Sequence, residues 1–224
     1  MRILIIGYGR MGQLVASLCP EYGLEVAGTV DITEAATPQR WPQADVAIDF
    51  SIADAVPENA RRLADRRVNM VIGTTGWSAH EAEVRRVVEN AGIGVVAAPN
   101  FALGVNLFVA LAERAAQLFG PQPAFGAWIH DAHHAAKRDA PSGTALLLEA
   151  AMKGQAFGRP IDVSSTRAGS IPGTHTLGFD APGETITLTH TARDRSGFAR
   201  GALEAARWVH GRKGWFTMKE VLGI

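Results

Sequence analysis

The stretch RILIIGYGRMG, residues 2–12, joins an apolar run to a G-x-G-x-x-G pattern. The apolar run predicts a buried β-strand, and apolar residues at helical spacing over 11–18 predict a helix directly after it. Gly7, Gly9 and Gly12 lie between the two elements, which is the context in which this pattern indicates a dinucleotide site. We therefore predict that the stretch opens a nucleotide-binding α/β fold.

Each part of the predicted site has a physical role. The first glycine permits a tight turn, the second lets the backbone approach a pyrophosphate, and the third lets helix and strand pack closely. The N–H groups at the helix N-terminus then bind the anion. Asp31 stands at the end of the second predicted strand, where a carboxylate receives the ribose hydroxyls. The predicted cofactor contacts here are Gly7, Tyr8, Gly9, Arg10, Met11, Gly12 and Asp31.

The residues after Asp31 bear on the choice between NADH and NADPH. Ile32 and Thr33 follow it, so no basic side chain stands directly behind it to bind a 2′-phosphate. Arg10, inside the glycine loop, is an alternative partner for that phosphate. We predict that NADH is preferred, or is accepted as well as NADPH.

Further apolar runs and helical patterns complete the first hundred residues. Predicted strands lie at 24–30, 44–50, 70–72 and 93–97, and polar helical patterns at 53–66 and 79–90. Strands that are apolar throughout and separated by helices form a parallel sheet buried on both faces. We predict that residues 1–103 form a Rossmann-type, doubly wound dinucleotide-binding domain.

Two segments that follow predicted strands are further candidates for the cofactor site. Ligands of such folds bind beyond the carboxyl ends of the strands. Hydroxyl, amide and backbone groups there suit the nicotinamide ribose and carboxamide, although ordinary turn chemistry is the alternative for either segment alone. The predicted contacts are Gly73, Thr74, Thr75, Ala98, Pro99, Asn100 and Phe101.

The second half of the sequence has a different pattern. An amphipathic helix is predicted at 104–119, a second helix at 143–152, and strands at 124–129, 162–166, 175–179 and 184–191. We predict an α+β domain over 104–195 for substrate binding and oligomerisation. The helix predicted at 198–209 is expected to return to the first domain, together with the rest of 196–224.

Composition excludes several classes of protein. The 22 Lys and Arg balance the 22 Asp and Glu, which argues against binding to nucleic acid or an anionic membrane. Cys19 is the only cysteine, so neither an intramolecular disulfide nor a cysteine zinc site can form. No run of 18 apolar residues exists, and the N-terminal apolar run is too short for a signal peptide. We expect a soluble, cytoplasmic protein.

The densest group of reactive side chains lies in DAHHAAKRDAPSGT, residues 131–144. His133, His134 and Lys137 precede Ser142, a natural N-cap for the helix that follows. The N–H groups after that cap predict an anion site. A proton donor, cations and an anion-binding helix end in one segment suit a small carboxylate substrate that gains or loses a proton.

Two other interpretations of this segment are possible. His130, Asp131, His133 and His134 include metal-ligand types. However, adjacent residues of an extended chain point to opposite faces, and the cations that follow oppose a divalent ion. A solvated loop with incidental histidines is the second alternative. Acid–base chemistry without a metal is the favoured interpretation.

With these motifs, the sequence resembles the 4-hydroxy-tetrahydrodipicolinate reductase (dihydrodipicolinate reductase) family of bacterial diaminopimelate and lysine biosynthesis. The resemblance runs nearly the full length, and its strongest part is the block from 132 to 145. The matching stretches are GYGRMG (7–12), IGTTGW (72–77), APNFALGVN (98–106), AHHAAKRDAPSGTA (132–145), RAG (167–169) and TH (189–190).

The resemblance implies an NAD(P)H-dependent reduction of a cyclic hydroxy-imine dicarboxylate to tetrahydrodipicolinate, with loss of water. By position, His133 matches the family's catalytic acid/base and Lys137 its proton donor. His134, Gly143 and Thr144 match contacts to the substrate carboxylate. The glycine loop, Asp31 and the segments at 73–75 and 98–101 match nicotinamide-cofactor contacts. The resemblance further implies a homotetramer built through the C-terminal sheet.

The sequence departs from the family in several places. It is shorter than the long members, with a trimmed stretch before Arg167, and its glycine loop has one residue fewer than the GxxGxxG form. Asp131 stands where Glu is common, and Ala102 where Ser is common. These departures concern the substrate loop and the cofactor preference.

Two functions compete with this one. One is another dinucleotide-dependent reductase or amino-acid dehydrogenase, such as an aspartate or diaminopimelate dehydrogenase. The other is a non-catalytic, cofactor-sensing or assembly protein that keeps the nucleotide fold. The His and Lys block that leads into the PSGT sequence favours the reductase over both.

Overall fold

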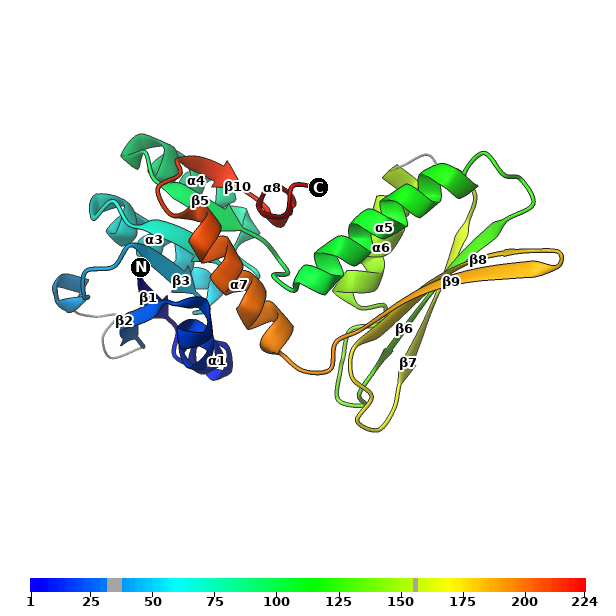
Figure 1. Ribbon diagram of the computed structural model, residues 1–224, viewed down its shortest axis with the longest axis horizontal. Helices are drawn as coiled ribbons and strands as arrows, with labels where there is room; N and C mark the ends of the chain where they lie inside the picture. The colour runs from blue at the N-terminus through cyan, green and yellow to red at the C-terminus, as the bar shows by residue number, and fades with distance from the viewer. Residues whose placement is uncertain (32–37, 155–156) are drawn as a thin grey trace. The chain divides into compact units, whose positions relative to one another are not determined.

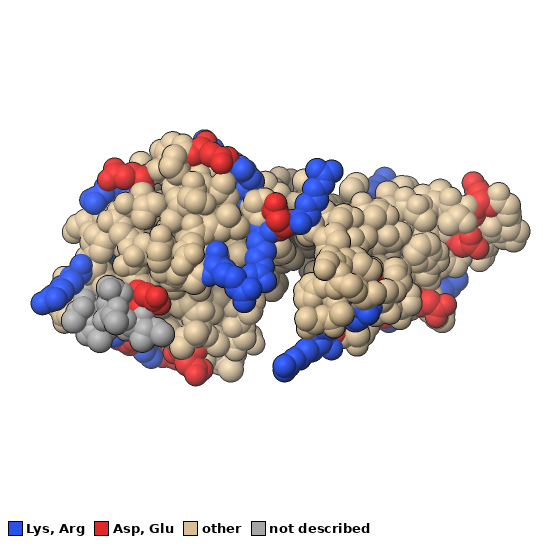
Figure 2. Space-filling view, turned by 90° about the horizontal axis from the view of Figure 1, so that it is seen from below, with Lys and Arg blue, Asp and Glu red and all other residues tan. Residues whose placement is uncertain are grey.

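The computed structural model describes residues 1–31, 38–154 and 157–224 (Figure 1). The chain divides into two compact units. Unit 1 comprises Met1–Leu103 and Ser196–Ile224, and unit 2 comprises Gly104–Arg195. No helix among the described residues is long and apolar enough to cross a membrane. On the face drawn in Figure 2, acidic and basic side chains both occur on each unit, and most of the surface is neither.

Unit 1 is built on a six-stranded parallel sheet with the order β10-β5-β4-β3-β1-β2. The strands are β1 (Arg2–Ile6), β2 (Glu25–Val30), β3 (Val46–Asp49), β4 (Asn69–Ile72), β5 (Gly94–Ala97) and β10 (Gly214–Phe216). The helices are α1 (Arg10–Leu18), α3 (Val56–Asp65), α4 (Glu81–Ala91), α7 (Ser196–Val209) and α8 (Met218–Leu222).

The sheet of unit 1 is buried on both faces. Alternate side chains of β1 point to opposite sides, as a strand requires. Ile3 and Ile5 pack in the core that contains residues of α1 and α7, whereas Leu4 and Ile6 pack in the core that contains residues of α3 and α4. The predicted Rossmann-type, doubly wound parallel sheet is therefore confirmed.

Two elements of unit 1, β10 and α8, were not predicted from the sequence. Three residues are too few for a hydrophobic period, so β10 has no sequence signal of its own. The helix α8 does have one, because Thr217 and Glu220 form a capping box. The Thr217 hydroxyl accepts a hydrogen bond from Lys219 N at 3.2 Å, and the Glu220 carboxylate accepts one from Thr217 N at 2.8 Å.

Unit 2 contains a four-stranded mixed sheet with the order β7-β6-β8-β9. Its strands are β6 (Gly126–His133), β7 (Ile161–Arg167), β8 (Thr174–Ala181) and β9 (Glu184–Thr191), and its helices are α5 (Leu103–Phe119) and α6 (Gly143–Gly154). β7 runs parallel to β6, and the other two pairs are antiparallel. The predicted α+β arrangement is confirmed.

Both helices of unit 2 cover the same face of its sheet (Figure 1). Ile129, Leu177 and Phe179 point into that core. On the other face Thr176 and Thr189 lie side by side, with their hydroxyl oxygens 3.0 Å apart. The polar–apolar alternation of β9 therefore reflects one covered and one open face.

β6 is longer than its sequence pattern predicted, which changes the setting of the histidine cluster. The predicted strand ended at 129, but pairing with β7 continues to His133, opposite Arg167, and pairing with β8 to Ala132. The sequence pattern fails here because polar side chains replace the apolar ones, while backbone pairing with both neighbours continues.

Candidate active site

The glycine loop of unit 1 has the geometry that its sequence predicted. Gly7 has a φ of +85°, and a Cβ there would lie 2.4 Å from the carbonyl oxygen of Phe50. A Cβ at Gly12 would lie 2.1 Å from the carbonyl oxygen of Gly7, so only glycine lets α1 pack against the loop. A Cβ at Gly9, in contrast, would meet no atom of residues 1–31, 38–154 and 157–224 within 4 Å. The outer side of the loop is therefore open.

The N-terminus of α1 is suited to an anion. Its N-cap residue is Gly9, none of the described side chains caps the helix, and its first turn holds no acidic residue. The first N–H groups of a helix have no intrahelical acceptors and carry a partial positive charge. Asp31 lies exposed just after β2, as expected, while Ile32 and Thr33 lie outside the described residues.

A buried carboxylate that the sequence analysis missed connects the loops at the carboxyl end of this sheet. Asp49, the last residue of β3, is fully buried. Its carboxylate accepts hydrogen bonds from Ser51 N at 2.8 Å, Asn59 Nδ2 at 3.0 Å and Thr74 Oγ1 at 2.8 Å. The sequence signal that could have identified Asp49 is an acidic residue near the end of the apolar run 44–50. Asp49 thus fixes Thr74, one of the predicted cofactor contacts.

The segments after β4 and β5 border one cavity of about 420 Å³. Thr74, Thr75, Ala98 and Pro99 line it together with side chains that the sequence analysis missed, among them Trp77 and Trp215. The remaining predicted contacts of the second segment are placed differently. Phe101 is buried in the core of unit 1, and the Asn100 side chain accepts a hydrogen bond from Ala102 N at 2.9 Å.

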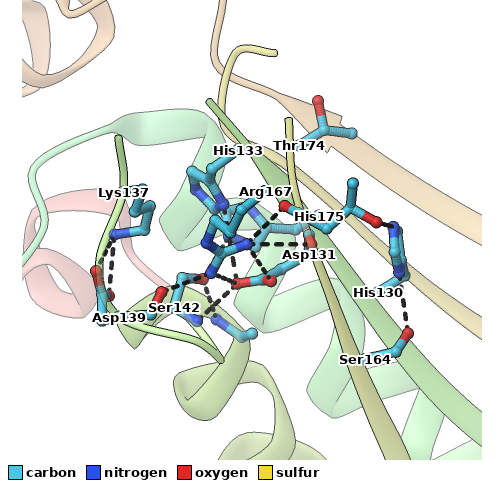
Figure 3. Close-up of polar contacts among 12 residues, drawn as sticks. His130, Asp131, His133, Lys137, Asp139, Ser142, Ser164, Arg167, Thr174 and His175 are labelled. Carbon is cyan, nitrogen blue, oxygen red and sulfur yellow. Dashed lines mark hydrogen bonds and ion pairs between the residues drawn. The ribbon is translucent and has the colours of Figure 1, made fainter. Parts of the chain in front are cut away.

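Unit 2 holds the second group of predicted site residues, around a buried ion pair (Figure 3). Asp131 on β6 is fully buried. Its two carboxylate oxygens receive hydrogen bonds from Arg167 Nη1 at 2.9 Å and Nη2 at 3.2 Å, and one of them also from Ser142 N at 2.6 Å. Burial raises the pKa of Asp131, but these hydrogen bonds outweigh it and hold the pKa well below its ordinary value.

His133 lies beside this ion pair on the same face of β6. Its Nδ1 is 3.8 Å from the Asp131 carboxylate, and its ring contacts the His175 ring edge-to-face at 5.1 Å. Burial lowers the pKa of His133. The Asp131 charge opposes that effect, and the charges of Lys137 and Arg167 reinforce it. The imidazole is therefore neutral at neutral pH and able to accept a proton.

Lys137 and His134 lie in the turn after β6. The ammonium of Lys137 donates to both carboxylate oxygens of Asp139, at 2.7 and 2.9 Å, and its side chain is a quarter exposed. His134 is exposed. Both side chains are thus accessible to a ligand at this end of β6.

The predicted N-cap of α6 is confirmed. The Ser142 hydroxyl accepts a hydrogen bond from Ala145 N at 3.2 Å and lies 3.0 Å from His175 Nε2. Gly143 and Thr144 occupy the first turn, where N–H groups have no intrahelical acceptors. A Cβ at Gly143 would meet no atom within 4 Å in the part of the chain that the structure describes. This helix end therefore offers donors to an anion.

His175 was not predicted to belong to the site, because a single histidine on a predicted strand gives no sign of its contact with Ser142. Burial lowers its pKa to about 4, from the ordinary value of 6.5. The folded protein then binds fewer protons than the unfolded chain between these values. We expect the contribution of His175 to stability to be fully present above about pH 6.5 and to be lost, by on the order of 3 kcal/mol, as the pH drops to about 4.

Urea unfolding across this pH window tests that expectation. The variant His175→Gln should show a shallower loss of stability, with the exposed His80→Gln as the control. An H175Q profile as steep as that of the wild type would contradict it.

The described residues include one group with the spacing of metal ligands: Asp131, His133 and His175, whose ligand atoms lie within 4.8 Å of one another. The group weighed from the sequence included His130, which points to the other face of β6, where Ser164 Oγ is 2.9 Å from its Nδ1. Arg167 already binds both carboxylate oxygens of Asp131, so a cation would have to displace a guanidinium. We assign no metal site here.

Comparison with known proteins identifies the family. Residues 1–101 match the family described as dihydrodipicolinate reductase, N-terminus, and residues 104–222 match its C-terminus. The 4-hydroxy-tetrahydrodipicolinate reductase of Methanoregula boonei is 36% identical, over 100% of this chain and 98% of that protein. The enzyme of the same name from Methanocorpusculum labreanum is 38% identical over 100% of both chains.

The solved structures include one of similar fold. It is the dipicolinate-bound dihydrodipicolinate reductase from Paenisporosarcina sp. TG-14, with a TM-score of 0.81, 24% identity and 97% of each chain covered. The family match spans both units of the chain and includes the glycine loop and the His133 segment. The chain therefore belongs to the dihydrodipicolinate reductase family, as its motifs predicted.

Proposed function

We propose that the protein reduces 4-hydroxy-tetrahydrodipicolinate to tetrahydrodipicolinate with a pyridine nucleotide, releasing water. The observation that carries the proposal is the grouping in unit 2 of a neutral imidazole, an ammonium and the first N–H groups of α6, in a chain of this family. Together these groups match a dicarboxylate that must exchange protons.

The cofactor fits unit 1. The open side of Gly9 and the unneutralised N-terminus of α1 suit a pyrophosphate, and the exposed Asp31 suits a ribose. When bound, a reduced nicotinamide supplies the hydride. The protein's part there is to hold the pyrophosphate on the backbone N–H groups of the loop and to fix Thr74 through Asp49.

In unit 2 the chain's own residues bind the substrate and move protons. The N–H groups of Gly143 and Thr144, with His134, hold a carboxylate. The Lys137 ammonium attracts the dianion and donates a proton to the atom that becomes negative when the neighbouring carbon receives hydride. The neutral His133 accepts and returns a proton, which the loss of water requires. One hydride and one proton enter, and one water leaves.

A pair of glycine variants tests the assignment of the nucleotide loop. Gly9→Ala adds a Cβ in open space, so we expect unchanged stability but about tenfold weaker nucleotide binding, because a methyl group keeps a pyrophosphate from the backbone. Gly12→Ala should destabilise the fold, since its Cβ would overlap the Gly7 carbonyl. Thermal unfolding and fluorescence titration with NADH measure both effects. A G9A variant that binds NADH as tightly as the wild type would argue against a pyrophosphate at this loop.

We also propose that NADH serves at least as well as NADPH, because the sequence places Ile32 and Thr33 directly behind Asp31. The measurement is kcat/KM for each nucleotide at saturating substrate. A value for NADPH well above that for NADH would overturn this preference and direct attention to Arg10 as the phosphate ligand.

The proposed assembly is a homotetramer formed through the sheet of unit 2, in the cytoplasm, with no nucleic-acid or membrane partner. The edge strand β9 and the open face that carries Thr176 and Thr189 support it, because these surfaces can pair with another copy. Light scattering of the purified protein measures the mass of the assembly.

A coupled assay tests the proposed activity. The unstable substrate is generated in the cuvette by the upstream synthase, and oxidation of NADH is followed by its absorbance. We expect oxidation that depends on both the synthase and this protein. Oxidation of NADH that requires a 2-oxo acid and ammonium instead would indicate an amino-acid dehydrogenase and would refute the proposal.

A further inference from the structure

Asp131 is the most buried polar residue of unit 2, and it has no role in the proposed mechanism. Asp131 and Arg167 form a two-point ion pair that touches neither Gly143 nor Thr144 directly. We propose that this pair is a positioning device that holds the segment 139–142, and with it the substrate-binding end of α6. The inference rests on the proposed function, because it assigns the pair a role in binding that substrate.

The pair holds the segment at both of its ends. Arg167 Nη2 donates to the carbonyl oxygen of Asp139 at 2.6 Å, and the Asp131 carboxylate accepts from Ser142 N at 2.6 Å. The two anchors thus come from the two partners of a single ion pair. A hydrogen bond to a charged group is shorter and stronger than one between neutral groups, which suits an anchor.

The residues on either side of the segment are the predicted substrate contacts. On its N-terminal side, the Asp139 carboxylate holds the ammonium of Lys137 at 2.7 Å. On its C-terminal side, Ser142 is followed directly by Gly143, the first residue of α6. A shift of the segment therefore moves an ammonium and a helix N-terminus at the same time.

A third contact, between Ser142 and His175, holds the same end of α6. The Ser142 hydroxyl lies 3.0 Å from His175 Nε2, and His175 stands opposite Asp131 in the pairing of β6 with β8. Ser142 is consequently held through its backbone by Asp131 and through its side chain by His175. The helix end is fixed by strands on both sides of β6, because Arg167 belongs to β7.

The alternative is that the Asp131–Arg167 ion pair only stabilises the pairing of β6 with β7. Seven residue pairs from Ala127 to His133 already align these strands, so the ion pair is not needed to set their register. It is also placed at the end of the strands nearest the segment, where His133 stands opposite Arg167. These facts indicate that the ion pair mainly holds the segment 139–142 and not the pairing of β6 with β7.

The variant Asp131→Asn tests the proposal most directly. Asparagine keeps the size of the side chain and an acceptor for Ser142 N but removes the charge that orients Arg167. We expect KM for the substrate and Kd for dipicolinate to rise about tenfold or more, with a smaller change in kcat. Nucleotide affinity should stay within about twofold of the wild type, because nothing in unit 1 has changed.

Two further variants separate charge from geometry. Asp131→Glu keeps the charge and should restore most of the dipicolinate affinity. Arg167→Lys keeps the positive charge but cannot bind two carboxylate oxygens and the Asp139 carbonyl together, so it should resemble D131N. R167K also keeps the proposal testable if D131N does not fold.

The matched control is Asp49→Asn, which alters an equally buried carboxylate in unit 1. Asp49 holds Thr74, so D49N should weaken nucleotide binding and leave dipicolinate binding unchanged. D131N should therefore weaken dipicolinate binding and leave nucleotide binding unchanged, and D49N should do the reverse.

Equilibrium binding of dipicolinate is measured without turnover, which keeps the two hypotheses apart. If the wild type binds dipicolinate and D131N and R167K bind it equally well while melting at lower temperature, the pair only stabilises the pairing of β6 with β7 and the inference is wrong. If the wild type does not bind dipicolinate, the proposed function fails first, and the inference fails with it.

Discussion

The variant His133→Ala is expected to lower kcat by about 10²–10⁴ while it changes KM for the substrate little, because a general acid or base acts in the transition state. The ring is partly exposed at the end of β6, and burial holds it neutral at neutral pH. Steady-state assays at saturating NADH measure both constants.

The neighbouring His134→Ala provides the contrast for that experiment. His134 is exposed and is proposed to contact a carboxylate, so its loss should raise KM more than it lowers kcat. If H133A kept kcat within about threefold of the wild type, a general acid–base contribution of the usual size would be untenable.

The variant Lys137→Ala should damage both constants and lower kcat/KM by on the order of 10³, because we propose that this one ammonium both attracts the dianion and donates a proton. Lys137→Arg separates the two roles. A guanidinium keeps the charge but does not release a proton at neutral pH, so K137R should bind substrate nearly normally and turn it over slowly.

Substrate binding and turnover are measured separately for these two variants, by dipicolinate titration and by the coupled assay. Normal turnover by K137R would show that Lys137 contributes only its charge. Normal kcat/KM in K137A would exclude both roles.

The features that were predictable from the sequence are those encoded by neighbouring residues. The turn at Gly7 follows β1 directly, and the steric reason for Gly12 is a contact with Gly7 only five residues away. Ser142 caps the helix that begins at the next residue, so its role also follows from local sequence. Such signals need no knowledge of the tertiary fold.

The contacts of the candidate sites that were missed depend on distant segments. Asp131 bonds with Arg167 across 36 positions, and Ser142 meets His175 across 33. Asp49 reaches Thr74 across 25 positions. These partners meet only because strands pair in a particular register, which a local pattern does not specify.

In a crystal structure of the protein with NADH and dipicolinate both bound, we expect a carboxylate of dipicolinate on the N–H groups of Gly143 and Thr144. Lys137 Nζ and the His133 ring should lie within about 3–4 Å of dipicolinate. The pyrophosphate of NADH should lie on the loop at Gly9. A dipicolinate ring that binds away from both His133 and Lys137 would overturn the proposed mechanism.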